Sequence, residues 1–161
     1  MSLLLSYLHL FGIALSLGSG IFFIVVFPFA LKSVADPAER TKAFANSLRF
    51  FHPLFLFGIC LTFMSGAIHL TDFKIEFGTE YFNRFGGLLI WKFAFTLLIF
   101  LIAGMQCFGM GLKLTRMANG VIPGDLATQE RYVRKIKTAQ SANSILLAIT
   151  IWIGIQLGSI P

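Results

Sequence analysis

The sequence predicts an all-α integral membrane protein, an antiparallel four-helix bundle with its N and C termini outside. Of its 161 residues, 57% are hydrophobic and 12% are charged, and the mean hydropathy is +0.81. These values lie far from those of soluble proteins. Four apolar stretches are each long enough to cross a bilayer core, which takes about 20 helical residues. We therefore expect one multi-pass domain over residues 1–161, in a membrane of the bacterial inner (plasma) type.

The first span is expected at about Leu3–Ala30, a run without any charged residue. The start of the chain lacks the basic region of a secretory signal, so we expect this helix to be retained. Helical periodicity places Gly12 and Ser16 on the face of His9. Small residues on this face are typical of close helix packing, and they would also leave room for a flat ligand beside His9.

Three further spans are separated by short connections. They are expected at about Phe50–Leu70, Gly87–Leu112 and Ala139–Ser159. Asp36 before Pro37 is typical of a helix start, so we expect a short helical turn in the first connection. The segment Asn119–Gly124 reads as a turn, and the basic run Glu130–Lys137 after it as an extension of the fourth helix.

Lysine and arginine gather in the first and third connections. The first holds Lys32, Arg40, Lys42 and Arg49, and the third holds Lys113, Arg116, Arg131, Arg134, Lys135 and Lys137. The second connection, Thr71–Gly86, is mixed, with Lys74 and Arg84 beside Asp72, Glu76 and Glu80. Because positive residues mark the cytoplasmic side, both termini are predicted outside. This topology also accounts for the net charge of +6 without a nucleic-acid partner.

The least lipid-like side chains of the four spans fall at one depth. Given a rise of about 1.5 Å per residue, this layer is roughly 10 Å thick and lies near the outer surface. It contains His9, His69, Trp91, Lys92, Trp152 and Gln156. Ionisable and polar residues inside a membrane commonly mark a functional site, so this layer is the candidate site.

Two histidines on adjacent transmembrane helices suit the axial ligation of a b-type haem. His9 and His69 are the candidate metal ligands, and Gly12, Ser16 and Trp91 are candidate residues around the ring. Lys92 would neutralise a propionate or act catalytically on a substrate. The alternatives are a hydrogen bond across the bundle for His9, contact with water for His69, and a snorkelling role for Lys92.

His52 and Arg49 lie near the cytoplasmic start of the second span, three residues apart and so on one face. They are candidates for contact with a haem propionate, a quinone head group or a lipid phosphate. A solvated helix end is the simpler interpretation of the pair.

Copper is the alternative cofactor. Its soft candidate ligands are Cys60, Met64, Met105, Cys107 and Met110. They show no clustered motif, and such residues in apolar helices mostly serve packing. Both cysteines fall within spans, so a disulfide is not expected.

Three stretches carry a resemblance to known families, and one of them, in the second span, runs from Arg49-Phe50 to Thr62 through Gly66. The stretch Leu8-His9-Leu10 with Gly18-Ser19-Gly20, and the third-span stretch Gly86-Gly87-Leu88-Leu89-Ile90-Trp91-Lys92, resemble the copper-resistance D (CopD) membrane family and the HemJ-type protoporphyrinogen oxidases. The resemblance to the HemJ-type oxidases implies haem b at His9, a functional lysine at Lys92 and oxidation of a porphyrinogen. Asp125–Arg131 does not match the acidic segment of the HemJ-type proteins.

The leading hypothesis is thus a haem b redox protein that transfers electrons with a quinone or a partner protein, or oxidises a porphyrinogen. A copper transport or homeostasis protein is the alternative. A third interpretation is a non-catalytic accessory subunit, packed in a larger membrane complex or a homo-oligomer.

Overall fold

The computed structural model describes residues 3–158, and for residues 73, 76, 77, 79, 81, 82, 84, 85 and 158 it describes the backbone alone. Ser159, predicted as the end of the fourth span, lies outside this range, as do the side chains of Glu76 and Arg84. The described residues are nearly all helical, and none of them forms a strand. The all-α prediction is confirmed.

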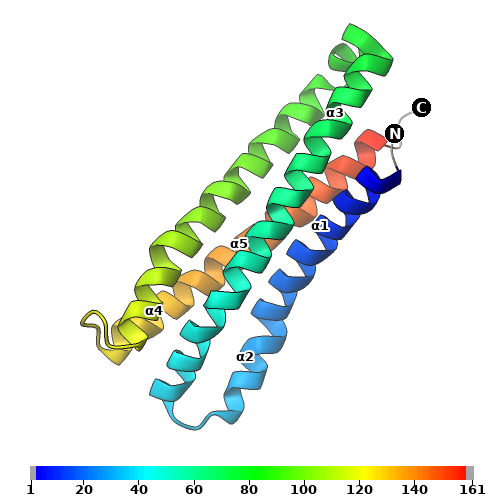
Figure 1. Cartoon of the computed structure of the whole chain (residues 1–161). Helices are drawn as coiled ribbons and strands as arrows, with labels where there is room; N and C mark the ends of the chain where they lie inside the picture. The colour runs from blue at the N-terminus through cyan, green and yellow to red at the C-terminus, as the bar shows by residue number, and fades with distance from the viewer. Residues whose placement is uncertain (1–2, 159–161) are drawn as a thin grey trace.

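Four helical stretches are long and apolar enough to cross a membrane. They are Leu3–Ser33, Pro37–Asp72, Gly86–Ala118 and Leu126–Leu157. Each predicted span lies within one of them as far as the described residues extend, and each stretch is longer than its prediction. Figure 1 shows neighbouring stretches running in opposite directions, with the two termini at the same end.

The first stretch changes its winding near Pro28. It consists of α1 (Leu3–Ile21), the π-helical segment η1 (Phe22–Val26), α2 (Phe27–Ala30) and the 3-10 turn η2 (Leu31–Ser33). Pro28 has no N–H to donate to the preceding turn, and just before it the N–H of Phe27 donates to the oxygen of Phe22, five residues back. The widened turn lets the helix continue past the proline.

The second and third spans form one helical hairpin, α3 (Pro37–Gly104). The oxygen Oδ1 of Asp36 accepts from the N–H of Ala38 at 3.0 Å, which confirms the predicted helix start. The chain reverses at Gly78, where φ is 58° and ψ is −142°, a conformation that favours glycine. We call residues 37–77 the first arm and residues 79–104 the second arm.

The predicted second connection, Thr71–Gly86, is not a loop. Helix continues on both sides of Gly78, so the hairpin projects beyond the ends of the other helices (Figure 1). The first connection is likewise shorter than expected, only residues 34–36, because α3 begins there and runs on into the second span.

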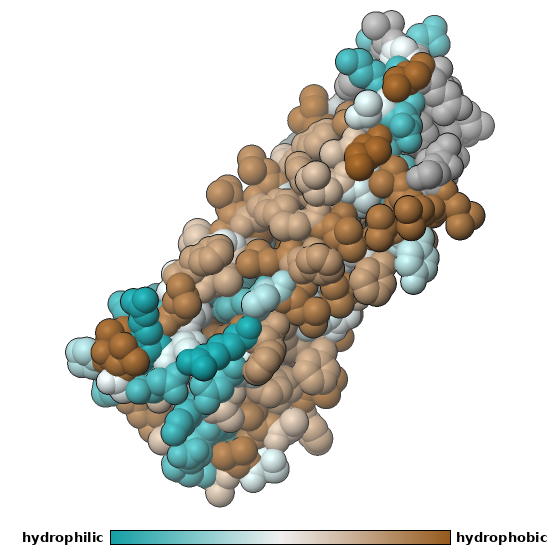
Figure 2. All heavy atoms as spheres, viewed as in Figure 1, coloured by the Kyte–Doolittle hydropathy of each residue, from teal (hydrophilic) through white to brown (hydrophobic). Residues whose placement is uncertain are grey.

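The third stretch ends with the π-helical segment η3 (Met105–Gly111) and α4 (Leu112–Ala118), and the fourth is α5 (Leu126–Gly158). The predicted turn at Asn119–Gly124 is confirmed, and the run Glu130–Lys137 is helical as expected. We call the end formed by residues 31–49 and 113–137 the basic end. Figure 2 shows hydrophilic side chains gathered there and a broad hydrophobic belt along the bundle.

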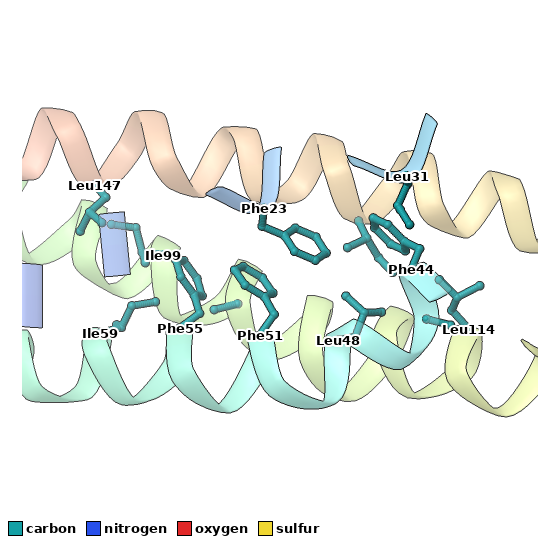
Figure 3. Close-up of a cluster of buried hydrophobic side chains, with 13 residues drawn as sticks. Phe23, Leu31, Phe44, Leu48, Phe51, Phe55, Ile59, Ile99, Leu114 and Leu147 are labelled. Atoms are coloured by element: carbon teal, nitrogen blue, oxygen red, sulfur yellow. The ribbon is translucent and has the colours of Figure 1, made fainter. Parts of the chain in front are cut away.

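An aromatic cluster fills the half of the bundle next to the basic end (Figure 3). The rings of Phe23 and Phe51 stack with centroids 4.0 Å apart, and Phe44 lies 5.1 Å from Phe23. Large aromatic rings from α3 and η1 thus fill the interior of this half of the bundle.

Candidate functional site

The other half of the bundle encloses a cavity of about 380 Å³. Its lining comes from α1, both arms of α3 and α5, so the cavity lies between all four spans. The wall is mainly aliphatic and aromatic, and its polar groups include His9, His69 and Lys92. An apolar pocket of this size with a few convergent polar groups is typical of a site for a small molecule or cofactor.

A hydrogen bond from the first arm of α3 orients His9. Its Nδ1 lies 2.9 Å from Oγ of Ser65, and that hydroxyl donates to the carbonyl oxygen of Leu61 at 2.7 Å. Since the hydroxyl proton is used there, the serine oxygen accepts from His9 Nδ1–H. We infer that the Nε2 atom of His9 keeps its lone pair, as a metal-ligating histidine with an outer hydrogen-bond partner does.

His9 and His69 lie next to each other in the cavity lining. Their ring centroids are 5.9 Å apart and their planes are nearly perpendicular, at 85°. A metal–imidazole bond is about 2 Å, so two imidazoles on opposite sides of one metal ion have ring centroids about 6 Å apart. The Nδ1 atom of His69 is buried without a hydrogen-bond partner among the described residues. Both observations fit a metal held between the two rings.

The cavity offers two imidazole side chains, those of His9 and His69, as donors to a metal. Among the residues that the structure describes, no group of three or more His, Cys, Asp or Glu side chains gathers. A structural zinc ion takes four protein ligands, whereas haem iron needs only axial ones from the protein.

Lys92 reaches the cavity from the second arm of α3. A Cβ atom at Gly154 of α5 would lie 3.4 Å from its Nζ atom, so a larger residue there would crowd the ammonium group. Hence three of the predicted site residues, His9, His69 and Lys92, lie around one cavity.

Gly12 and Ser16 do not line this cavity, contrary to the expectation that they leave room for a ligand. A Cβ atom at Gly12 would lie 2.6 Å from Oγ1 of Thr62, and one at Gly58 would lie 2.9 Å from the backbone nitrogen of Ser16. These small residues form the contact between α1 and the first arm of α3. The glycine beside His9 is Gly66, whose added Cβ would lie 3.1 Å from the ring.

Trp91 also lies away from the cavity lining. Its side chain is 60% exposed, and its ring stacks on Phe95 at a centroid distance of 5.7 Å. Adjacent residues on a helix point about 100° apart, so Lys92 turns inward while Trp91 faces the outside of the bundle.

His52 and Arg49 lie in the other half of the molecule, and they do not form a pair. Arg49 is exposed, whereas His52 is only 6% exposed, which corrects the expectation of a solvated helix end. The π-helical η3 brings Gly111 against the His52 ring, so that any Cβ at Gly111 would collide with it. The Nε2 atom of His52 has no partner among the described side chains.

The soft candidates for copper largely face outward. Cys60 is exposed, and so are Met64 and Met105. The structure therefore gathers no thiolate or thioether cluster from these three residues.

No family model, no curated protein and no solved structure matches the chain.

Ser65 and Gly154 fall on the inward faces that periodicity predicts for the second and fourth spans, but their contacts with His9 and Lys92 were not predicted. Ser65 lies one helical turn before His69, and Gly154 lies two residues before Gln156 on the fourth span. Their spacing was a usable signal for Ser65, because i and i+4 share a helix face. The proximity of Gly154 to Lys92 depends on how α5 is rotated against α3, which spacing alone does not give.

Proposed function

We propose that this chain is a haem b-binding redox protein of the inner membrane, with its termini outside and His9 and His69 as axial ligands. The observation that carries the proposal is the pair of imidazoles 5.9 Å apart at an apolar cavity between the spans. When bound, haem b supplies one-electron transfer. The chain's own residues orient the His9 ring through Ser65 and leave the remaining wall mainly apolar.

Lys92 is the proposed catalytic or charge-balancing residue. Its ammonium group enters an apolar cavity, and no described acidic side chain pairs with it. A half-buried cation in an apolar wall favours an anionic partner, and a propionate or a carboxylate-bearing porphyrin substrate would supply one. The electron acceptor would be a quinone or a partner protein. Membership of the HemJ-type family would fit this assignment.

Purified protein tests the proposal by its spectrum. We expect reduced-minus-oxidised bands of six-coordinate haem b, and we expect His69→Ala to remove the low-spin signature while membrane insertion persists. His52→Gln is the matched control, because this histidine lies in the other half of the bundle and should leave the spectrum unchanged.

Other outcomes would contradict the haem assignment. Colourless protein with stoichiometric copper would indicate copper transport or homeostasis, and colourless, metal-free protein would indicate an accessory subunit. Lys92→Met should keep the haem content but change the potential or turnover; if neither changes, Lys92 serves packing.

A further inference from the structure

A second pocket, of about 220 Å³, lies at the basic end. The end of the first span, the start of α3 and the first turns of α5 enclose it. Its lining carries the cations Arg40, Arg134 and Lys137 against a single acid, Glu130. Leu31 and Phe44 are among the apolar residues that form the rest of the wall. The pocket thus combines an excess of positive charge with apolar walls.

Two of the cations are held in place before any ligand arrives. The Nε and Nη2 atoms of Arg40 donate to the carbonyl oxygen of Val34 at 3.1 and 2.7 Å, which fixes the guanidinium plane and leaves its other N–H groups for an anion. The Nζ atom of Lys137 lies 5.6 Å from the centroid of the Phe44 ring. This cation–π contact keeps the ammonium group at the pocket.

The position of the pocket along the bundle indicates which kind of anion binds there. It lies where the stretches Leu3–Ser33, Pro37–Asp72 and Leu126–Leu157 have their basic ends. In a membrane-spanning bundle this is the level of the lipid head groups, and basic pockets between helices at that level bind anionic head groups. A lipid phosphate arrives there by lateral diffusion and brings acyl chains that suit the apolar belt (Figure 2).

We propose that this pocket binds the phosphate of an anionic phospholipid. Arg40 and Arg134 contribute planar donors to the phosphate oxygens, and Lys137 contributes a point charge. The carboxylate of Glu130 repels the phosphate and so weakens its binding. The site lies at the opposite end of the bundle from the histidine cavity, so it stands whether or not the chain binds haem.

Native mass spectrometry of the full chain in mild detergent tests the proposal, with phosphatidylglycerol as the probe and phosphatidylcholine as the neutral comparison. The variant Arg134→Gln/Lys137→Gln should bind phosphatidylglycerol about thirtyfold more weakly, since each cation near the membrane surface contributes about fivefold. The matched control is Arg131→Gln/Lys135→Gln, which removes the same charge from the same helix at positions outside the pocket lining. Glu130→Gln should strengthen binding.

Three results would overturn the proposal. Equal losses in the two double variants would mean diffuse attraction to the whole basic end. Equal retention of phosphatidylglycerol and phosphatidylcholine by the unmodified chain would mean that binding does not depend on the charge of the head group. Displacement of phosphatidylglycerol by millimolar inorganic phosphate would mean a site for free anions.

Discussion

The two halves of the bundle use the same four spans, yet one is hollow and the other is filled. In the histidine half, side chains from all four spans leave a cavity of about 380 Å³. In the aromatic half, the Phe23 ring stacks on Phe51 with centroids 4.0 Å apart and lies tilted by 49° against Phe44 at 5.1 Å. Glycine, alanine and threonine are among the residues that line the cavity, whereas phenylalanine rings fill the aromatic half, so side-chain size accounts for much of the difference.

The contact between α1 and the first arm of α3 shows how the hollow half is held together. Gly12 and Gly58 let the two backbones approach closely, and Ser16 is fully buried between them. Because these two helices meet so tightly, the remaining space opens toward the second arm of α3 and α5, where Lys92 and Gly154 lie. A close contact on one side thus allows a cavity on the other.

A layer of buried amides lies between the halves. The Nε2 atom of Gln106 donates to Oε1 of Gln140 at 3.0 Å, and Asn143 lies one turn before the cavity residue Leu147. Both polar side-chain atoms of Asn143 are buried without a partner among the described residues. Intramembrane polar groups of this kind are costly to leave unpaired, which distinguishes this layer from the mainly apolar interior on either side.

Truncation of one phenylalanine in each half is the most direct test of this contrast. Phe51 is 8% exposed and Phe63, which lines the cavity, is 39% exposed. Phe51→Ala should destabilise the protein by about 3 kcal/mol or more, and Phe63→Ala by about 1 kcal/mol, because a residue beside existing space loses fewer contacts. Unfolding by titration with a denaturing detergent measures both. Equal losses would mean that the aromatic half is no better packed.

An alanine at Gly12 tests the helix contact that bounds the cavity. Its Cβ atom would lie 2.8 Å from the backbone nitrogen of Thr62, so α1 must move, at a cost of about 1–3 kcal/mol. Gly18 on the same helix is the control, since a Cβ there meets nothing within 4 Å and alanine favours helix by up to about 1 kcal/mol. If Gly12→Ala is as harmless as Gly18→Ala, the close contact does not support the hollow half.

The sequence predicted the four spans well because lipid imposes a length and a composition on each of them. The helix start at Asp36 and the turn at Asn119–Gly124 were also predictable, since proline, glycine and capping side chains act locally. The hairpin at Gly78 was not, because a polar, mixed-charge stretch reads as a loop whether its backbone is helical or not.

The candidate site divides in the same way. Depth counting brought His9, His69 and Lys92 to one level, and the structure places all three around one cavity. Which neighbours form the cavity depends on how each helix is rotated, and periodicity alone assigned Gly12 and Ser16 to the ligand side. The π-helical η3 changes which residues of the third span face inward, and it places Gly111 against the His52 ring. The burial of His52 therefore could not be predicted from regular helical periodicity.

The amide pair at the boundary should contribute a smaller, measurable coupling. Gln106→Leu and Gln140→Leu each leave one amide without its partner, and the double variant removes both. Hydrogen bonds between transmembrane helices average about 0.6 kcal/mol in double-mutant cycles, and we expect a coupling of that size in detergent unfolding. Strict additivity would show that the two amides act independently and that the boundary layer is not cooperative.

The smallest effect is expected at the basic end, where Asp125 caps α5. Its Oδ1 atom accepts from the N–H of Thr128 at 3.1 Å, and hydrogen bonds from the side chain and backbone of Thr128 lower the pKa of the carboxyl group. A lowered folded-state pKa means that the cap stabilises the protein above the unfolded-state value near 4, and that this contribution is lost as the pH falls through the folded-state pKa.

Asp125→Ala should therefore lower the unfolding midpoint slightly at pH 7, and this difference should shrink as the pH falls below the unfolded-state value near 4 and the carboxyl group of the unmodified chain becomes protonated. Hydrogen exchange at Thr128 and Gln129 should report the same local fraying of α5, because the backbone N–H of Gln129 donates to the Asp125 carbonyl oxygen. The histidine cavity lies at the other end of α5, so Asp125→Ala should not change the haem spectrum or ligand binding at that cavity. A response there would show that the two halves are coupled through α5 and would weaken the contrast between them.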